Sequence, residues 1–384
     1  MLSDKLSFNK VFIYFSFLFF LFSKTASGQG CCSGGCGSPI AGGGSPGVLM
    51  AKQMEIGSSF QYMNGNKFYA RDKDTVHLFD NFNSQYVYTR LAYGFTRDLT
   101  VSLEAGYYLN KSEMGLHKTD SFKIKGIGDL LIFPKYDVYN NVDERRKIEF
   151  TVGLGYKIPL GKHNDSTLVY TNPINGRETW AKNPPLVQAT TGSQDVVMYA
   201  FFFRGFPKHN FRVYANSTYI RKGWNSLGEK FGDYSSVGLF FGKTILKSLG
   251  ITLQVKGEWI GKMSYNKDID VKLLGGGNSM MALYNIDVKS TGSKKILFIP
   301  QISYSIKSFS IYALGEIPLY QYVNGAQVVV TPLTFGVAYR FFTSKNLTAK
   351  TGEIIYECPM KCKGSESKEP GTCPVCGMQL IEKK

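Results

Sequence analysis

Cysteine is missing from most of this chain. The seven cysteines lie near the two ends, at Cys31, Cys32, Cys36, Cys358, Cys362, Cys373 and Cys376. No cysteine occurs between Cys36 and Cys358, so disulfide bonds cannot stabilise the body of the protein. The body must fold through backbone hydrogen bonding and side-chain burial.

Long apolar runs are also scarce. The run "VFIYFSFLFFLF" at 11–22 would rise only about 18 Å as a helix, too little for a hydrocarbon core of about 30 Å. It follows Lys5 and Lys10 and precedes Ala26, Ser27 and Gly28, an order typical of a secretory signal peptide. We therefore expect a signal peptide over 1–28, with a retained membrane anchor as the alternative.

Catalytic motifs and nucleic-acid signatures are absent from the sequence. The four histidines, His77, His117, His163 and His209, show no His-x-x-x-His spacing, and no Gly-x-Ser-x-Gly motif occurs. No nucleophile and base can be paired, so we expect no catalytic residues and no enzyme activity, with an outer-membrane enzyme as the alternative. The formal charge of +16 comes from scattered Lys and Arg, which in an exported chain does not indicate a nucleic-acid partner.

The sequence has instead a repeated two-residue alternation. In "TVSLEAGYYL", Val101, Leu103 and Ala105 share one face, while Ser102 and Glu104 share the other. About twelve such segments can be marked. They cover 54–63, 85–95, 99–110, 126–139, 147–159, 195–206, 210–221, 233–245, 250–262, 294–306, 308–322 and 326–342.

The segments have the length and the aromatic ends of membrane strands. Most are near ten residues long, which suits a tilted strand crossing a bilayer, whereas soluble strands average five to six. Long and short connections mostly alternate, as in bacterial outer-membrane barrels, where the short turns are periplasmic. The expected fold is all-β, a transmembrane outer-membrane β-barrel of about 12 antiparallel strands, with a soluble secreted β-protein as the alternative.

One face of these strands is polar and predicts a hydrated lumen. Its charged candidates are Glu104, Glu149, Lys157, Arg212, Lys256, Glu258 and Arg340. They are expected either to line a pore or to pair with one another inside a plugged barrel. The segments "GIGDLLIFPKYDVY", "YKIPLGKHN" and "TGSQDVVMYAFFF" also resemble a loosely defined family of outer-membrane transporters. That family includes barrel proteins associated with phenol meta-pathway degradation.

The C-terminal tail carries two close cysteine pairs, C-x3-C and C-x2-C, ten residues apart. Such spacing can place four thiolates around one tetrahedral ion. "YECPMKCKGSESKEPGTCPVCGMQL" at 356–380 resembles the heavy-metal-binding domain of periplasmic metal-efflux adaptors and metal-pumping ATPases. It departs from that pattern where Lys361 replaces a histidine and Cys362 follows, which favours softer metals.

The tail is therefore expected to bind a heavy-metal ion, Zn(II) or Cu(I). The expected ligands are Cys358, Cys362, Cys373 and Cys376, with thioether contacts from Met360 and Met378 to copper. A pair of structural disulfides is the alternative. Cys31, Cys32 and Cys36, in a glycine-rich segment, form a second candidate metal cluster, with a disulfide or lipid attachment at Cys31 as alternatives.

These observations predict five regions. They are a signal peptide at 1–28, a Cys/Gly-rich segment at 29–50, a barrel at 51–342, a linker at 343–355 and a heavy-metal-binding domain at 356–380. The predicted function is heavy-metal handling or export, of the copper or zinc class, in the bacterial outer membrane, with the tail in the periplasm. The expected partners are outer-membrane lipid, metal ions and periplasmic metal-efflux components. The alternative is a general porin for small organic solutes with an accessory metal-binding domain.

Overall fold

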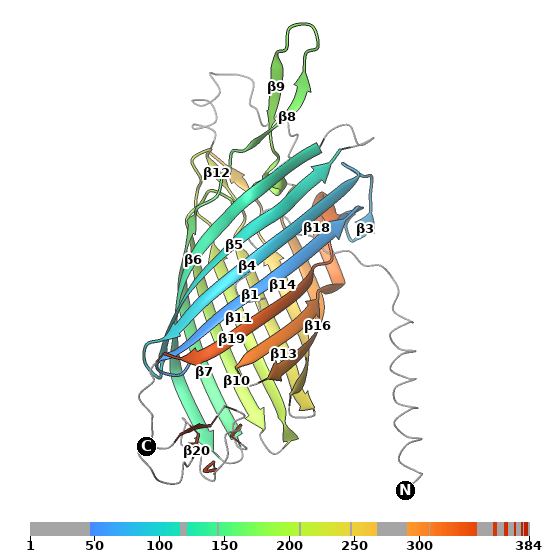
Figure 1. Ribbon diagram of the computed structural model, residues 1–384. Coiled ribbons are helices and arrows are strands. Elements are labelled where there is room, and N and C mark those ends of the chain that lie inside the picture. The colour runs from blue at the N-terminus through green and yellow to red at the C-terminus, as the bar shows by residue number, and fades with distance from the viewer. Residues whose placement is uncertain are drawn as a thin grey trace, which may run out of the picture.

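The computed structural model describes most of the chain from residue 47 to residue 343, together with parts of the tail. The described ranges are 47–115, 121–143, 146–206, 209–245, 248–266, 290–306, 308–343, 356–358, 365–367, 372–373, 378 and 380–382. Within them the chain forms a closed 12-strand antiparallel barrel, in which pairing of β14 with β16 closes the ring (Figure 1). The described residues contain no helix that is long and apolar enough to span a membrane.

The barrel strands follow the expected segments closely. They are β1 (Gln53–Gly65), β4 (Asn81–Gly94), β5 (Leu99–Met114), β6 (Ser121–Asp143), β7 (Arg146–Pro159), β10 (Asp195–Phe206), β11 (Phe211–Arg221), β13 (Tyr234–Ile245), β14 (Leu249–Ile260), β16 (Ser293–Ile306), β17 (Phe309–Gly315) and β19 (Leu333–Phe342). The other strands lie in the loops, the closing hairpin and the tail. They are β2 (Lys67–Arg71), β3 (Lys73–Asp74), β8 (Ser166–Thr171), β9 (Glu178–Lys182), β12 (Glu229–Lys230), β15 (Ser264–Tyr265), β18 (Ile317–Val329), β20 (Tyr356–Glu357) and β21 (Ile381–Glu382).

The two faces of each strand differ as the alternation predicts. Leu103 points outward and is 47% exposed, whereas its neighbour Glu104 points inward and is 2% exposed. On β14, Val255 lies on the outer face and Glu258 on the inner face. The outer face is apolar and the inner face is polar, as in a barrel that is surrounded by lipid.

The long and short connections lie at opposite ends of the barrel. The hairpin of β8 and β9 projects beyond one end, and β20 lies near the other, beside the short turns (Figure 1). The long connection that carries β8 and β9 also includes a short 3₁₀ turn, Pro185–Val187. We call the end with the long connections the loop end and the other the turn end.

The closing hairpin differs from the expectation of two uninterrupted strands at 308–322 and 326–342. The first strand is divided at Glu316 into β17 and β18, and the last arm is divided before Leu333. Pro318 lies two residues after the first interruption, near the start of β18, and Pro332 lies within the second. Proline has no backbone N–H to donate to a ladder, so it interrupts regular pairing in a sheet.

Candidate functional site

A ladder of alternating charges crosses four neighbouring strands near the turn end of the lumen. Strand register sets Arg340 directly opposite Glu55, and Arg90 directly opposite Glu104. The Arg90 guanidinium bridges the two carboxylates, with its Nε 3.1 Å from Glu104 Oε1 and its second contact to Glu55. The side chains of Arg90 and Glu55 are 5% and 0% exposed. Charge-assisted contacts of this kind brace the inner wall from β19 to β5.

Neutral groups complete the coordination of Glu104. The Ser102 hydroxyl donates to Glu104 Oε1 at 2.6 Å, and the Tyr88 hydroxyl donates to Oε2. Both oxygens of this buried carboxylate therefore have partners inside the protein, as burial of a charge requires. The charged residues of this region are paired with one another. Of the two arrangements expected from the sequence, this is the pairing inside a plugged barrel.

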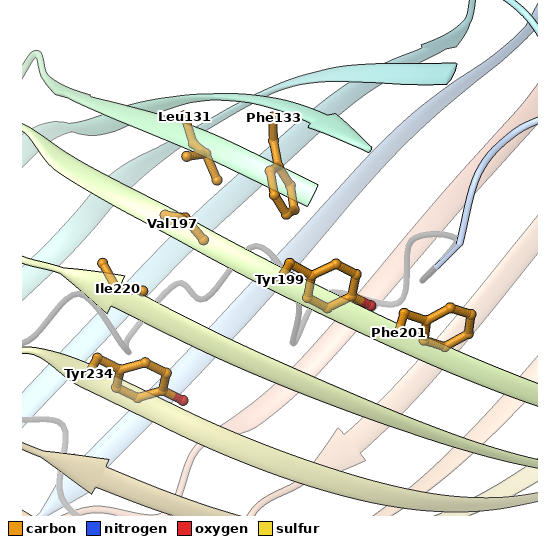
Figure 2. Close-up of a cluster of buried hydrophobic side chains, with 7 residues drawn as sticks. All are labelled: Leu131, Phe133, Val197, Tyr199, Phe201, Ile220 and Tyr234. Carbon is orange, nitrogen blue, oxygen red and sulfur yellow. The ribbon is translucent and has the colours of Figure 1, made fainter. Parts of the chain in front are cut away.

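Aromatic side chains cover the adjacent part of the lumen wall. Figure 2 shows Phe133, Tyr199 and Phe201 on β6 and β10, within a buried cluster that continues to Tyr234 on β13. The Lys135 ammonium lies 5.7 Å from the Phe133 ring centroid and 5.8 Å from that of Tyr199. These distances are within the range of a cation–π contact, so this wall combines a basic side chain with apolar surface.

The described chain begins inside the lumen. Gly47 is buried beside Glu149 and Phe201, where a Cβ would lie 1.9 Å from Glu149 Oε1. The backbone N–H of Leu49 donates to Thr100 Oγ1 at 2.7 Å. Residues 47–50 thus lie against the inner wall at the turn end, and a larger residue at position 47 would displace the Glu149 carboxylate.

An inserted loop, residues 183–194, fills part of the lumen at the loop end. Val187 is fully buried and packs with Tyr86 and Tyr108 of β4 and β5. The Lys111 ammonium donates to the carbonyl oxygen of Gln188 at 2.8 Å. The inserted loop therefore narrows the mouth and is fixed by both apolar and polar contacts.

Buried ion pairs fix the C-terminal end of the inserted loop. Asp195 Oδ2 lies 2.9 Å from Lys157 Nζ and 3.0 Å from Lys222 Nζ. Lys157 also donates to Thr191 Oγ1 in the inserted loop at 2.8 Å. Burial lowers the pKa of Lys222, which lies just beyond β11, and the nearby Lys157 lowers it further, whereas Asp195 opposes this shift.

Replacing Asp195 with alanine should loosen the mouth. The change leaves the Lys157 and Lys222 ammonium groups facing each other without their shared carboxylate, which should weaken the hold on the inserted loop. We expect a larger single-channel conductance in planar bilayers. Asp165→Ala is the matched control, because its partner Lys162 is largely exposed. An unchanged conductance in Asp195→Ala would contradict a constricting role for the inserted loop.

A third charged group lies on the wall formed by β13, β14 and β16. Lys256 Nζ is 3.5 Å from Glu258 Oε2 and 3.5 Å from Glu316 Oε2, while Lys295 Nζ is 3.7 Å from Glu258 Oε1. The Tyr234 hydroxyl donates to Glu258 at 3.1 Å. The predicted lumen residues Lys256 and Glu258 are therefore inward and paired, at the position where the closing hairpin is interrupted.

The tail forms a small structure of its own. Tyr356 pairs with Glu382 and Glu357 with Ile381, which joins β20 and β21. Cys358 and Cys373 are 0% and 2% exposed and belong to one buried cluster with Leu380. This pairing brings the start and the end of the tail together.

Hydrogen bonds orient the tail backbone around the two cysteines. The Cys358 N–H donates to Ser365 Oγ at 3.2 Å, and the Cys373 N–H donates to the Met378 carbonyl oxygen at 2.6 Å. Met378 also packs against the cluster. Two of the four predicted thiol ligands and one predicted thioether are thus brought together from positions far apart in the tail.

The remaining predicted ligands lie outside the described residues. They are Cys362, Cys376 and Met360 in the tail, and Cys31, Cys32 and Cys36 in the N-terminal segment. Over the described part of the chain, no group of three or more His, Cys, Asp or Glu side chains is arranged to hold a metal ion. Arg212 lies on β11 beside Gly242 of β13, on the inner face.

Two features of the lumen were not predicted from the sequence. The inserted loop carries the short apolar run Pro185–Val187 within a polar connection, and this run was the available signal that the loop folds inward. The packing of Gly47 against the wall had no such signal, because a glycine in a glycine-rich segment is typical of a flexible linker.

Comparison with known proteins supports both parts of the chain. Residues 355–383 match the family of the heavy metal binding domain. The COG4313 outer membrane channel from Pseudomonas putida F1 is similar in structure, with a TM-score of 0.57 and 13% identity over 78% of this chain and 98% of that chain. A FadL homologue from Pseudomonas aeruginosa has a TM-score of 0.37 and 7% identity over 76% of this chain and 91% of that chain. No curated protein matches the chain. The protein is a 12-strand barrel with the fold of an outer-membrane channel, and its C-terminal tail carries a heavy metal binding domain.

Proposed function

We propose that the protein handles or exports soft heavy-metal ions, of the copper or zinc class, which its tail captures. The observation that carries this proposal is the buried cluster of Cys358 and Cys373 within residues that match the heavy metal binding domain. Cys362 and Cys376 complete the proposed set of four thiolates. Four thiolates satisfy the tetrahedral preference of Zn(II), and thiolates with thioethers suit Cu(I).

The methionines distinguish the two metals in this proposal. Met378 packs against the Cys358 and Cys373 cluster, and Met360 lies two residues after Cys358. A thioether is a soft ligand, so both can contact Cu(I) but add little to a Zn(II) site. Equilibrium dialysis of the purified full-length protein under reducing conditions tests the proposal, with one tightly bound ion expected from the tail of each chain.

We also propose a place for each chain end. The barrel lies in the bacterial outer membrane, among its lipids, and the tail lies in the periplasm, where it can meet metal-efflux components. Supporting this, β20 lies at the turn end of the barrel (Figure 1), and short turns of outer-membrane barrels are periplasmic. We propose Cys31, Cys32 and Cys36 as a second soft-metal cluster in the periplasm, because an even number of strands places both chain ends on the same side.

A tag inserted at Asn175 should be labelled on intact cells, whereas a tag after Lys384 should not. Asn175 lies in the turn of the projecting β8 and β9 hairpin, at the loop end. Antibody staining of intact and permeabilised cells measures both positions. Staining of the C-terminal tag on intact cells would place the tail outside and contradict the periplasmic assignment.

A non-catalytic role as a porin for small organic solutes is the second candidate. The aromatic wall around Phe133, Tyr199 and Phe201 favours it, because it offers apolar contacts inside the lumen. In that case the tail serves as an accessory metal-binding domain. Higher expression in copper or zinc salts favours metal handling, and expression that is indifferent to these salts favours the porin.

A further inference from the structure

The barrel wall has an interrupted seam in its closing hairpin. Pairing of β17 with β19 ends at Gly315 and Leu333, one residue before the bond from the Glu316 N–H to the Pro332 carbonyl oxygen. Beyond this point β18 pairs with β16, while the returning arm at 327–329 pairs with β2. Residues 316–332 are all described, and no ladder joins the two arms between Glu316 and Val323.

Two prolines account for the interruption. In an antiparallel hydrogen-bonded pair, both residues donate an N–H to the other, and such pairs recur at every second residue. Pro332 has no N–H to donate to the Glu316 carbonyl oxygen. In the same register, the next hydrogen-bonded pair would be Pro318 with Val330, and Pro318 has no N–H to donate there either. Two successive hydrogen-bonded pairs therefore each lack one donor, which weakens the wall here.

Apolar side chains fill the seam. Val328, Val329 and Val330 are 2%, 0% and 0% exposed. Val328 and Val330 pack with Phe68 and Phe82, so Val329 between them faces the outer side. Outward residues of the same arm such as Phe335 are exposed, so the burial of Val329 sets the seam apart from the regular wall.

An apolar groove on the outer face lies next to the seam. It has a volume of about 680 Å³ and is lined by residues of β1, β16, β17 and β19, including Ser58, Phe60, Ile302, Ala313, Phe335 and Val337. Ala313 lies two residues before Gly315, and Phe335 lies two residues after Leu333, where the pairing stops. The small side chains of Ser58 and Ala313 lie among larger ones, which leaves room for a chain of methylene groups.

We propose that the groove and the seam form a lateral portal, through which an apolar molecule dissolved in the bilayer reaches the interior of the barrel wall. The occupant has the chemistry of a fatty acyl chain, because the groove is apolar and faces lipid, and the buried side chains that line the seam are also apolar. Entry separates the two arms at Pro318 and Pro332, where few backbone hydrogen bonds must break. This activity is separate from the metal binding of the tail.

Photolabelling of the full-length protein tests the portal. The protein is placed in phospholipid vesicles with a palmitic acid that carries a diazirine in its chain, irradiated, and its labelled peptides are identified by mass spectrometry. The portal predicts labels on Phe335 and Ala313, as on other outward residues, and also on the buried arm at 327–330. Labels confined to outward residues of all strands, with none on 327–330, would overturn it.

Two variants make the test specific. Ser58→Phe with Ala313→Phe fills the groove, and Pro318→Thr with Pro332→Thr restores the two missing donors. Both should lose the labels on 327–330. The controls are Ala105→Phe with Ser217→Phe on outward positions of β5 and β11, and Pro134→Thr on β6, which should keep those labels. Equal labelling of 327–330 in variants and controls would show that the palmitic acid does not pass through this seam. Heat-modifiable mobility on unboiled gels checks that each barrel has folded.

Discussion

Replacing Cys373 and Cys376 with serine should abolish tight metal binding by the full-length protein and leave the barrel intact. The change removes two of the four proposed thiolates, and a serine hydroxyl is a poor ligand for a soft ion. Structural zinc sites contribute about 10–16 kcal/mol, so the loss of half the ligands should weaken affinity by about three orders of magnitude or more. Competition with a chromophoric chelator measures the change.

The control variant carries serine at Cys31, Cys32 and Cys36. If the tail is the tight site, this variant should keep one tightly bound ion per chain. Heat-modifiable mobility should be the same in both variants, because the tail lies outside the barrel strands. Parent and tail variant binding the same metal with the same affinity would refute the site. Disulfides in both tail pairs of the native protein would also refute it.

The pH dependence of binding follows from the ligand chemistry. Each thiol must lose a proton before it binds, and an ordinary cysteine thiol has a pKa of about 8.5. Metal binding should therefore release protons, and the affinity should fall steadily as the pH falls. A site built from thioethers and neutral imidazoles alone would lose less affinity, so the slope reports how many thiolates bind.

The barrel itself was largely predictable from local pattern. The alternation in 195–206 and 250–262 needs only a two-residue period, and the structure places strands at Asp195–Phe206 and Leu249–Ile260. The inner position of Glu104, Lys157 and Glu258 follows from the same parity. A period of two is set by the backbone of an extended strand, so it does not depend on distant contacts.

The plugging of the lumen was not predictable in the same way. Whether Arg90 pairs with Glu104 depends on the register of β4 against β5, and a shift of one residue would reverse every side chain. The inserted loop depends on contacts between Val187 and strands far away in the sequence. Such contacts are set by the closure of the whole barrel, which no single segment encodes.

In the closing hairpin, two prolines oppose the strand structure that the two-residue alternation predicts. Alternation favours uninterrupted strands at 308–322 and 326–342, and most residues obey it. Pro318 and Pro332 each remove a donor, and the structure divides both strands near them. For the tail, the cysteine spacing predicted a tetrahedral site, and the resemblance of residues 356–380 to the heavy-metal-binding domain was enough to identify the domain.

Replacing Arg90 with methionine should destabilise the barrel by about 3–5 kcal/mol, the usual cost of removing one partner from a buried ion pair. Arg90 bridges Glu55 and Glu104, whose side chains are 0% and 1% exposed. Methionine fills a similar volume, so the loss reports the charge rather than a cavity. The temperature at which heat-modifiable mobility is lost, together with circular dichroism, measures the effect.

Two further variants separate the buried charge from the rest of the side chain. Lys162→Ala removes a cation that is 75% exposed and 3.7 Å from Asp165, and should change stability by no more than about 1 kcal/mol. Adding Glu55→Gln and Glu104→Gln to Arg90→Met removes the unpaired carboxylates, so much of the lost stability should return. Arg340 then faces a neutral amide at position 55, but its own side chain is 40% exposed, so water can solvate it. If Arg90→Met alone is as stable as the parent, water must reach Glu55 and Glu104 freely. The charged residues would then line an open pore and would not stabilise a closed lumen.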